Sequence, residues 1–431
     1  MPNHLFKAIC LSLLFAACKG NKTEQAPAKD SNVLVAAVVL PPLATTYFND
    51  IARFIAGMAP LADCSIKKLH ENDDWIKFSK SFDSLWTGLE TKRLSKQRAW
   101  AKSETGSIAS ICKNLFYPFS GADFMNAHLF FPKAINTVMI GLEPPGTVPD
   151  VKKFEKDTLA HYFSKVRKSI QAIMKFSFYR TNSMRNDFSN EELDGTLPNI
   201  LIFMARSGCH ITNISPLELD ANGNAAAKQL VDFNNKSYRG IRISYMLQSD
   251  IVARTLSYFS ADIGNSGLTN DKPFLSYLTH LPVDEVTYLK SASYLMHKPY
   301  FSTIRNLILG KSKAVLQDDS GIPYRFFGAN WNKQLYGTYD KPIKLFGNWY
   351  QLDFHKAFQD SLHIRKLGFG IGYDWQEGQS NLMLAIRNGE AKYIEGNEET
   401  KTTKAVTAKV RKSKESMLPN DSNGKVIIEG E

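Results

Sequence analysis

Residues 116–123 (FYPFSGAD) and Glu143 have the types and the spacing that could hold a nucleoside. Residues 118–121 follow the apolar segment 115–117, and Glu143 follows the apolar segment 137–142. A predicted helix at 122–131 lies between these two segments. In a sheet with helices on both faces, a glycine after the first strand lets the backbone approach a ligand closely. A carboxylate about 20 residues further on can accept a hydrogen bond from a ribose hydroxyl, and Glu143 has this position relative to Gly121. A purely structural strand, turn and helix would explain the same residues without a ligand.

Further carboxylates follow other apolar segments. Asp318 and Asp319 lie in the run 317–324 (QDDSGIPY), and Asp262 follows residues 255–259. Adjacent carboxylates at such a corner could bind Mg²⁺ or Ca²⁺, or supply a general base. Neighbouring residues of an extended strand point to opposite faces, however, and the Asp-Ser-Gly-Ile-Pro sequence is equally suited to a turn. If the strand ends meet, Asp262 and Asp318 would join Glu143 in one crevice, and we expect no dedicated metal site of Cys and His residues.

Apolar periodicity predicts the elements that would position these side chains. Residues 71–102 and 150–176 carry apolar residues at three- and four-residue steps, which is typical of amphipathic helices. Shorter patterns predict helices at 122–131 and 300–309, and strands at 115–117, 137–142, 197–205, 241–247, 255–259, 314–317, 367–373 and 382–387. Strands that alternate with helices favour an α/β fold. We expect a mostly parallel, doubly wound, Rossmann-like sheet with antiparallel edge strands and a helical N-terminal part.

The order strand, turn, helix, strand over residues 114–146 resembles the first part of Rossmann-like methyltransferases that use S-adenosylmethionine. This resemblance implies that Gly121 and Asp123 lie near the cofactor and that Glu143 binds its ribose. The chain departs from the family pattern, because a single glycine replaces the glycine-rich loop and Pro118 stiffens the turn. Four segments also resemble a family of uncharacterised bacterial secreted proteins and lipoproteins, namely 116–121, 141–144, 290–296 and 317–324. That second resemblance implies an envelope location and brings no known activity, cofactor or catalytic residue.

The N-terminus predicts export. His4 and Lys7 precede an apolar stretch of roughly ten residues, too short to span a bilayer, so we expect a signal peptide at 1–17. The residues Ala16-Ala17-Cys18 resemble the lipobox of bacterial lipoproteins, although Phe15 replaces the usual Leu. The resemblance implies that Cys18 is acylated and anchors the chain to a membrane of the bacterial cell envelope. Ordinary secretory cleavage is the alternative. Residues 18–32 are polar and are expected to form a tether.

The amino-acid composition indicates a globular protein, but it does not identify a binding partner. The chain has 431 residues, of which 43% are hydrophobic and 22% charged, as in globular proteins. Its net charge of +11 permits contact with nucleic acid, anionic lipid or acidic glycans, but no specific nucleic-acid signal is present. We expect a helical region at 33–110, one α/β domain at 111–390 and a disordered basic tail at 391–431. Cys64, Cys112 and Cys209 are expected to be ordinary buried thiols, with one disulfide as the alternative.

Three functions remain open from the sequence. The leading hypothesis is an envelope lipoprotein that binds a small molecule or a protein partner, and its candidate ligand-binding residues are Gly121, Asp123, Glu143, Asp262 and Asp318. The first alternative is a methyltransferase relative that uses the same crevice, although an exported protein would lack S-adenosylmethionine, which is made in the cytoplasm. The second alternative is a metal-assisted hydrolase centred on Asp318 and Asp319. No catalytic residue and no cofactor is assigned.

Overall fold

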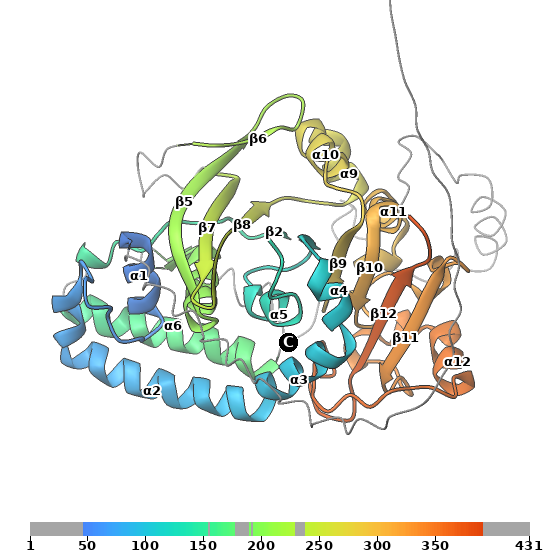
Figure 1. Cartoon of the computed structure of the whole chain (residues 1–431), viewed down its shortest axis with the longest axis horizontal. Coiled ribbons are helices and arrows are strands. Elements are labelled where there is room, and N and C mark those ends of the chain that lie inside the picture. The colour runs from blue at the N-terminus through green and yellow to red at the C-terminus, as the bar shows by residue number, and fades with distance from the viewer. Residues whose placement is uncertain (1–45, 154–155, 177–188, 191–192, 229–237, 391–431) are drawn as a thin grey trace, which may run out of the picture. The chain divides into compact units, whose positions relative to one another are not determined.

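The computed structural model describes residues 46–153, 156–176, 189–190, 193–228 and 238–390 (Figure 1). The expected signal peptide (1–17), tether (18–32) and basic tail (391–431) lie outside the described residues. The described part has an α/β fold with a ten-stranded mixed sheet in the order β11-β12-β10-β9-β1-β2-β8-β7-β5-β6. A separate two-stranded sheet joins β3 (Ser189–Asn190) and β4 (Leu193–Asp194).

Five parallel strands form the centre of the large sheet. They are β10 (Ser312–Gln317), β9 (Glu285–Leu289), β1 (Asn114–Tyr117), β2 (Asn136–Gly141) and β8 (Asp250–Ser260). All five residues of β9 are buried, as is every residue of β10 except Lys313. Strands covered on both faces carry continuous apolar runs, which explains why the predictions for 115–117, 137–142, 255–259 and 314–317 are confirmed.

Antiparallel strands extend the sheet on both sides of this centre. On one side β12 (Asn381–Arg387) pairs with β10, and β11 (Trp331–Gly337) pairs with β12. On the other side β7 (Gly240–Leu247), β5 (Cys209–Leu219) and β6 (Ala225–Ala227) follow β8 in turn. The sheet is therefore mixed, and its antiparallel part is larger than the edge strands that the sequence predicts.

The N-terminal part of the described chain is helical, as predicted. It contains α1 (Tyr47–Ile55), η1 (Lys67–Glu71), α2 (Asp73–Leu89), the π-helical turn η2 (Glu90–Leu94), α3 (Ser95–Glu104) and α4 (Gly106–Ile111). Asn72 caps α2, because its Oδ1 accepts from the backbone N of Asp74 at 2.8 Å. Trp75, Phe78 and Phe82 of this helix are buried, and Phe78 stacks on Phe163 of α6 (Lys156–Phe176) with 4.1 Å between ring centroids.

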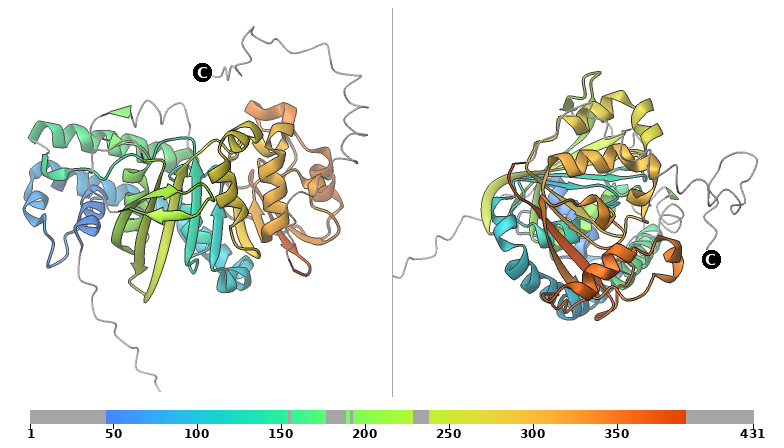
Figure 2. Two further views of the ribbon diagram at one scale, coloured as in Figure 1. Left: turned by 90° about the horizontal axis from the view of Figure 1, so that it is seen from above. Right: turned by 90° about the vertical axis from the view of Figure 1, so that its right-hand side faces the viewer.

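Helices cover both faces of the sheet (Figure 2). One core packs α1, α2, α5 (Phe124–Phe130), α6 and α8 (Leu197–Arg206) against the sheet, and Tyr117 of β1 belongs to it. Phe116, its neighbour in β1, belongs to the opposite core with α9 (Asn265–Asn270), α10 (Lys272–Thr279), α11 (Ser302–Lys311) and α12 (Leu352–Asp360). Five 3₁₀ turns complete the connections, namely η3 (Val151–Lys153), η4 (Leu295–His297), η5 (Pro299–Phe301), η6 (Tyr324–Phe326) and η7 (Lys344–Trp349).

The strand predicted at 197–205 is wrong, because these residues form helix α8. Every residue from Leu197 to Ala205 is buried, so the helix has no exposed polar face over this run, and Asn199 is the single polar residue within it. An apolar run of this length cannot be assigned from periodicity alone. Pro198 in the first turn was the available signal, since proline is favoured at that position of a helix.

The strand predicted at 367–373 is also wrong, because β12 pairs with β11 instead. The predicted segment is buried but irregular, and Gly370 passes so close to the backbone of Trp375 that a Cβ would lie 1.6 Å from its carbonyl oxygen. Strand β11 has polar residues at Asn332, Lys333 and Gln334, which hid it from an analysis of apolar runs.

The three cysteines in the described residues are free thiols. Cys112 and Cys209 are buried, and Cys64 is half-buried. Burial raises the pKa of Cys112 to about 12, so this thiol stays protonated at neutral pH. The prediction of ordinary thiols agrees with this state.

Candidate functional site

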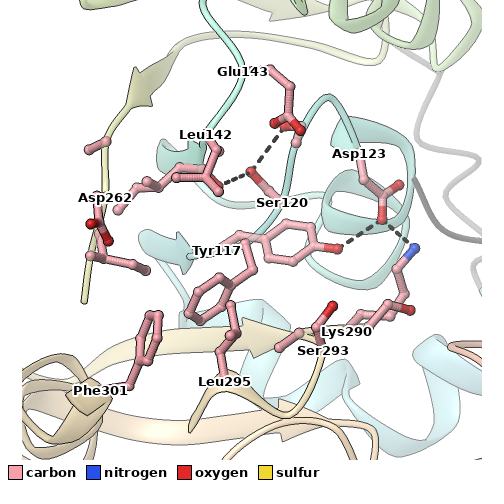
Figure 3. A pocket seen from close by; sticks show the side chains of 18 residues that line it. Tyr117, Ser120, Asp123, Leu142, Glu143, Asp262, Lys290, Ser293, Leu295 and Phe301 are labelled. Carbon is pink, nitrogen blue, oxygen red and sulfur yellow. Dashed lines mark hydrogen bonds and ion pairs between the residues drawn. The ribbon is translucent and has the colours of Figure 1, made fainter. Parts of the chain in front are cut away.

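The carboxyl ends of four parallel strands surround one pocket with a cavity volume of about 120 Å³ (Figure 3). Residues 117–123 follow β1, residues 140–143 end and follow β2, residues 261–263 follow β8, and residues 290–295 follow β9. The structure thus brings four predicted residues together, namely Gly121, Asp123, Glu143 and Asp262. It does not bring Asp318 to the pocket lining.

Two glycines allow the turns after β1 and β2 to meet. Gly121 has a φ of +49°, a left-handed conformation that glycine adopts without steric cost. A Cβ on Gly141 would lie 3.3 Å from the Cα of Gly121 and 2.9 Å from a carboxylate oxygen of Glu143. The backbone N of Ser120 donates to the carbonyl of Ile140 at 2.8 Å and fixes this corner. Gly121 was identified from the sequence, whereas the requirement for glycine at 141 was not.

Asp123 makes hydrogen bonds and an ion pair within the pocket wall. It caps α5 by accepting from the backbone N of Asn126, and the Tyr117 hydroxyl donates to its Oδ2 at 2.9 Å. The Nζ of Lys290 lies 2.5 Å from the same oxygen, and the side chains of this ion pair are only 3% and 2% exposed. Burial raises the pKa of Tyr117 well above its ordinary value, so its hydroxyl remains a donor. Asp123 therefore holds the wall together and also belongs to the lining, and its expected role in ligand binding stays a prediction.

Glu143 and Asp262 are the other two carboxylates of the lining. Glu143 is buried, and the Tyr258 hydroxyl donates to its backbone carbonyl at 2.8 Å. Asp262 is exposed, and one of its carboxylate oxygens accepts from the backbone N of Gly264 at 2.8 Å. In Figure 3 Glu143 lies across the pocket from Ser293, Leu295 and Phe301, which form an opposite and partly apolar wall.

The lining of this pocket has a negative formal charge. Asp123, Glu143 and Asp262 are its acids, and Lys290 is its single base among the described residues. Because Lys290 and Asp123 form a buried ion pair, their charges cancel locally. The two remaining carboxylates favour a neutral or cationic ligand over an anionic one.

The segment after β9 is held in a conformation that is unusual for its residues. Ser291, Ser293 and Tyr294 have φ values of +52°, +50° and +53°. Three consecutive backbone N–H groups in this loop donate to side chains from distant segments. The N–H of Ser291 donates to Asp318 Oδ2 at 2.8 Å, that of Ala292 to Ser320 Oγ at 2.8 Å, and that of Ser293 to Tyr373 Oη at 3.0 Å.

Backbone strain is concentrated at this pocket. Five non-glycine residues among those described have a left-handed φ, and three of them, Phe119, Ser291 and Ser293, line the pocket. A fourth, Tyr294, is the next residue in the chain. Such a conformation costs roughly 1–2 kcal/mol for an L-residue and clusters at functional sites in proteins.

Asp318 and Asp319 lie behind the pocket wall and diverge from each other. Asp318 accepts from the backbone N–H groups of Ser291 and Ser320, while Asp319 accepts from the Tyr294 hydroxyl and from Asn381 Nδ2. Burial raises the pKa of both, and the adjacent Asp318 helps to raise that of Asp319 to about 7. Asp318 therefore lies outside the pocket lining as a buried anchor for the loop, and its expected role in ligand binding stays a prediction.

Within the described ranges, no group of three or more His, Cys, Asp or Glu residues is arranged to hold a metal ion. Asp318 and Asp319 instead make the internal hydrogen bonds above, and the metal-assisted hydrolase stays an untested prediction. The sequence did not predict the contacts of Lys290 with Asp123 or of Tyr373 with Ser293. A single Lys after an apolar run and a single Tyr in a loop belong to no recognisable motif.

Comparisons with protein-family models, with curated proteins and with solved structures give no match to this chain. The two resemblances described from the sequence therefore stay predictions. Among the described helices, none combines the length and the apolar character needed to cross a bilayer.

Proposed function

We propose that the pocket binds a nucleoside without phosphate groups and that Glu143 accepts hydrogen bonds from its ribose hydroxyls. The observation that carries this proposal is the charge of the lining at the strand ends, where two carboxylates stand beside an already paired Lys290. A phosphate would be repelled by these carboxylates, whereas a ribose offers two hydroxyl donors to them. The pocket is partly open and has a cavity volume of about 120 Å³, so it would enclose only part of a nucleoside, and the rest would extend toward solvent.

The strand order supports this choice of ligand. Counted in chain order, the five parallel strands β1, β2, β8, β9 and β10 lie in the order 3-2-1-4-5 across the sheet. This is the order of doubly wound nucleotide-binding sheets, which bind their ligands where the strand order reverses. The reversal falls between β1 and β9, and both strands end at the pocket. We therefore interpret the centre of the sheet as Rossmann-like and the strands β5, β6 and β7 as an addition to it.

For a chain that stays in the cytoplasm, where S-adenosylmethionine is made, this cofactor is the second candidate for the same pocket. Its sulfonium cation suits a pocket with two carboxylates, and Gly121 lies in the lining at the turn after β1, where the resemblance implies that the cofactor binds. Phe119 has a φ of +62°. It therefore adopts a left-handed backbone conformation of the kind that glycines adopt in the glycine-rich loops of the methyltransferases. Glu143 would hold the ribose, and Asp262 would accept from the amino group of the base. When bound, this cofactor would supply a methyl group to a second substrate.

We also propose that Cys18 is acylated and that the chain is an anchored lipoprotein of the bacterial cell envelope. The support is the sequence pattern of residues 1–32. Labelling with radioactive palmitate should mark the wild type and not Cys18→Ala, and equal label in both would refute acylation at this position. An anchored protein outside the cytoplasm would bind a nucleoside present there, whereas a cytoplasmic one would have access to S-adenosylmethionine.

Isothermal titration tests the ligand class directly. We expect the full chain to bind adenosine, S-adenosylmethionine and S-adenosylhomocysteine, and to bind ATP more weakly than adenosine. Glu143→Gln should weaken adenosine binding about 10- to 100-fold, since hydrogen bonds to charged groups contribute about 1.5–3 kcal/mol. Glu218→Gln is the matched control, because Glu218 is exposed on β5 and lies outside the pocket lining. No heat at millimolar nucleoside, or unchanged affinity in Glu143→Gln, would refute the proposal.

A further inference from the structure

A second cavity lies between the N-terminal helices and the irregular segment near β12. It is lined by residues of α2 and η2, by Arg167 and Gln171 of α6, and by residues 369–377, and its volume is about 980 Å³. We propose that this cavity is a binding site for a small multivalent anion that carries at least two phosphate or carboxylate groups. This inference is independent of the proposed nucleoside site, which has a different lining.

The charge of the lining is the first argument for an anion. Lys92, Arg93 and Arg167 line the cavity, and Glu377 is its single carboxylate among the described residues. The Glu377 carboxylate lies 2.6 Å from Nζ of Lys96, so its charge is already matched by a lysine outside the lining. The lining therefore has a formal charge of +2, opposite in sign to that of the first pocket.

The environment of Arg93 strengthens this argument. Its side chain is half-buried, and burial lowers its pKa, although a guanidinium remains charged at any physiological pH. A charge in such a partly desolvated wall attracts an opposite charge more strongly than a fully hydrated one. Arg93 therefore contributes a partly desolvated cation to the wall, in addition to its interaction within the chain.

The local helix geometry is the second argument. Helices α2 and α3 are joined without a break through η2, a π-helical turn at Glu90–Leu94. Such turns are rare, and they occur often at functional sites. Lys92 and Arg93 both belong to this turn, so the irregularity directs consecutive cations toward the region that contains the cavity.

The size and the number of lining segments define the class of anion. A cavity of this volume is large enough for a drug-sized molecule, and its cations come from two segments, η2 and α6, that are far apart in sequence. Ser81 and Ser84 of α2 and Gln171 of α6 add neutral donors. An anion with two charged groups offers one group to the cations of η2 and another to Arg167 of α6.

The test is isothermal titration of the full chain with pyrophosphate and with citrate at constant ionic strength. We expect the wild type to bind at least one of them, and Arg167→Gln and Arg93→Gln to weaken that binding at least tenfold. Arg167 is exposed, so its variant should fold normally even if Arg93→Gln is less stable. The matched control is Lys356→Gln, which removes one exposed positive charge from α12 and should change the affinity less than twofold.

Preference for pyrophosphate would identify a phosphorylated ligand, and preference for citrate would identify a polycarboxylate. Two results would overturn the inference: no binding of either anion at millimolar concentration, or an equal loss of affinity in Arg167→Gln and Lys356→Gln, which would indicate general attraction by a basic protein. Glu143→Gln should bind the anion as the wild type does, so the outcome is separate from that of the nucleoside site.

Discussion

Glu285 makes the stability of this protein depend on pH in a direction that can be calculated. It is the first residue of β9 and only 2% exposed, and within the described structure its Oε1 has no hydrogen-bond partner. Burial raises its pKa from 4.5 to about 8, although the nearby Lys311 acts in the opposite direction. The folded protein therefore holds a proton on Glu285 at neutral pH, whereas the unfolded chain releases it near pH 4.5.

The sign and the magnitude follow from this difference in bound protons. Below pH 4.5 both states are protonated, and the stability contribution is fully present. Between pH 4.5 and about 8 the folded state binds more protons, so the free energy of unfolding falls by about 1.4 kcal/mol per pH unit. The total loss from Glu285 is about 5 kcal/mol, and it is complete above pH 8. Asp319, with a pKa raised to about 7, adds a loss of the same sign that ends near that pH.

The perturbation is Glu285→Gln, which keeps the size of the side chain and removes its titration. The variant should match the wild type in stability near pH 4.5 and exceed it by several kcal/mol at pH 8. Urea denaturation followed by circular dichroism at half-unit steps between pH 4.5 and 8.5 measures this difference. Glu218→Gln, on an exposed side chain, should give the wild-type profile. Parallel profiles for the wild type and Glu285→Gln would show that Glu285 is ionised in the folded state and would refute the reasoning.

Three further predictions concern the pocket. Lys290→Met should lower the free energy of unfolding by about 3–5 kcal/mol, because it leaves the buried charge of Asp123 without its cation; urea denaturation measures this, and Lys290→Met/Asp123→Asn should recover part of the loss. Gly141→Ala should cost about 1–3 kcal/mol and abolish adenosine binding, because its Cβ would press on the Tyr258 hydroxyl and on the Glu143 carboxylate. Gly347→Ala, whose Cβ meets no atom within 4 Å, should change neither quantity. Ser291→Gly should keep or raise the melting temperature, because glycine relieves a left-handed conformation that costs roughly 1–2 kcal/mol; a clear fall would show that the conformation is not strained.

The sequence predicts the pocket better than it predicts the sheet, and the reason is the range of the interactions involved. Gly121 and Glu143 belong to adjacent parallel strands joined by one short helix, so local pattern and spacing place them together. The order of the remaining strands depends on pairings between distant segments, such as β1 with β9, that no local pattern encodes. Helix α8 was mistaken for a strand because burial on all sides removes the polar face that distinguishes a helix.

The residues that shape the pocket wall were beyond sequence reasoning for the same reason. Lys290 meets Asp123 only because β1 and β9 are neighbours in the sheet. Asp318 has the sequence context of a turn, and its role as an anchor for Ser291 depends on the pairing of β9 with β10. A carboxylate pair in a sequence therefore does not distinguish a metal site from a structural anchor until the partners of each oxygen are known.

The combination of strain and burial at the pocket supports the proposal that this site binds a ligand. Four left-handed non-glycine residues, at roughly 1–2 kcal/mol each, together cost an amount comparable to the net stability of an ordinary domain. Glycine at Ser291 or Ser293 would give the same backbone with less strain. Instead, Asp318 and Tyr373 hold Ser291 and Ser293 through hydrogen bonds to their backbone N–H groups. Burial raises the pKa of Asp318, so keeping this carboxylate ionised costs free energy. A turn that only connects β9 to η4 would need neither the strain nor the buried carboxylate. A wall that must present fixed groups to a bound molecule needs both, because a glycine-rich loop would be free to move.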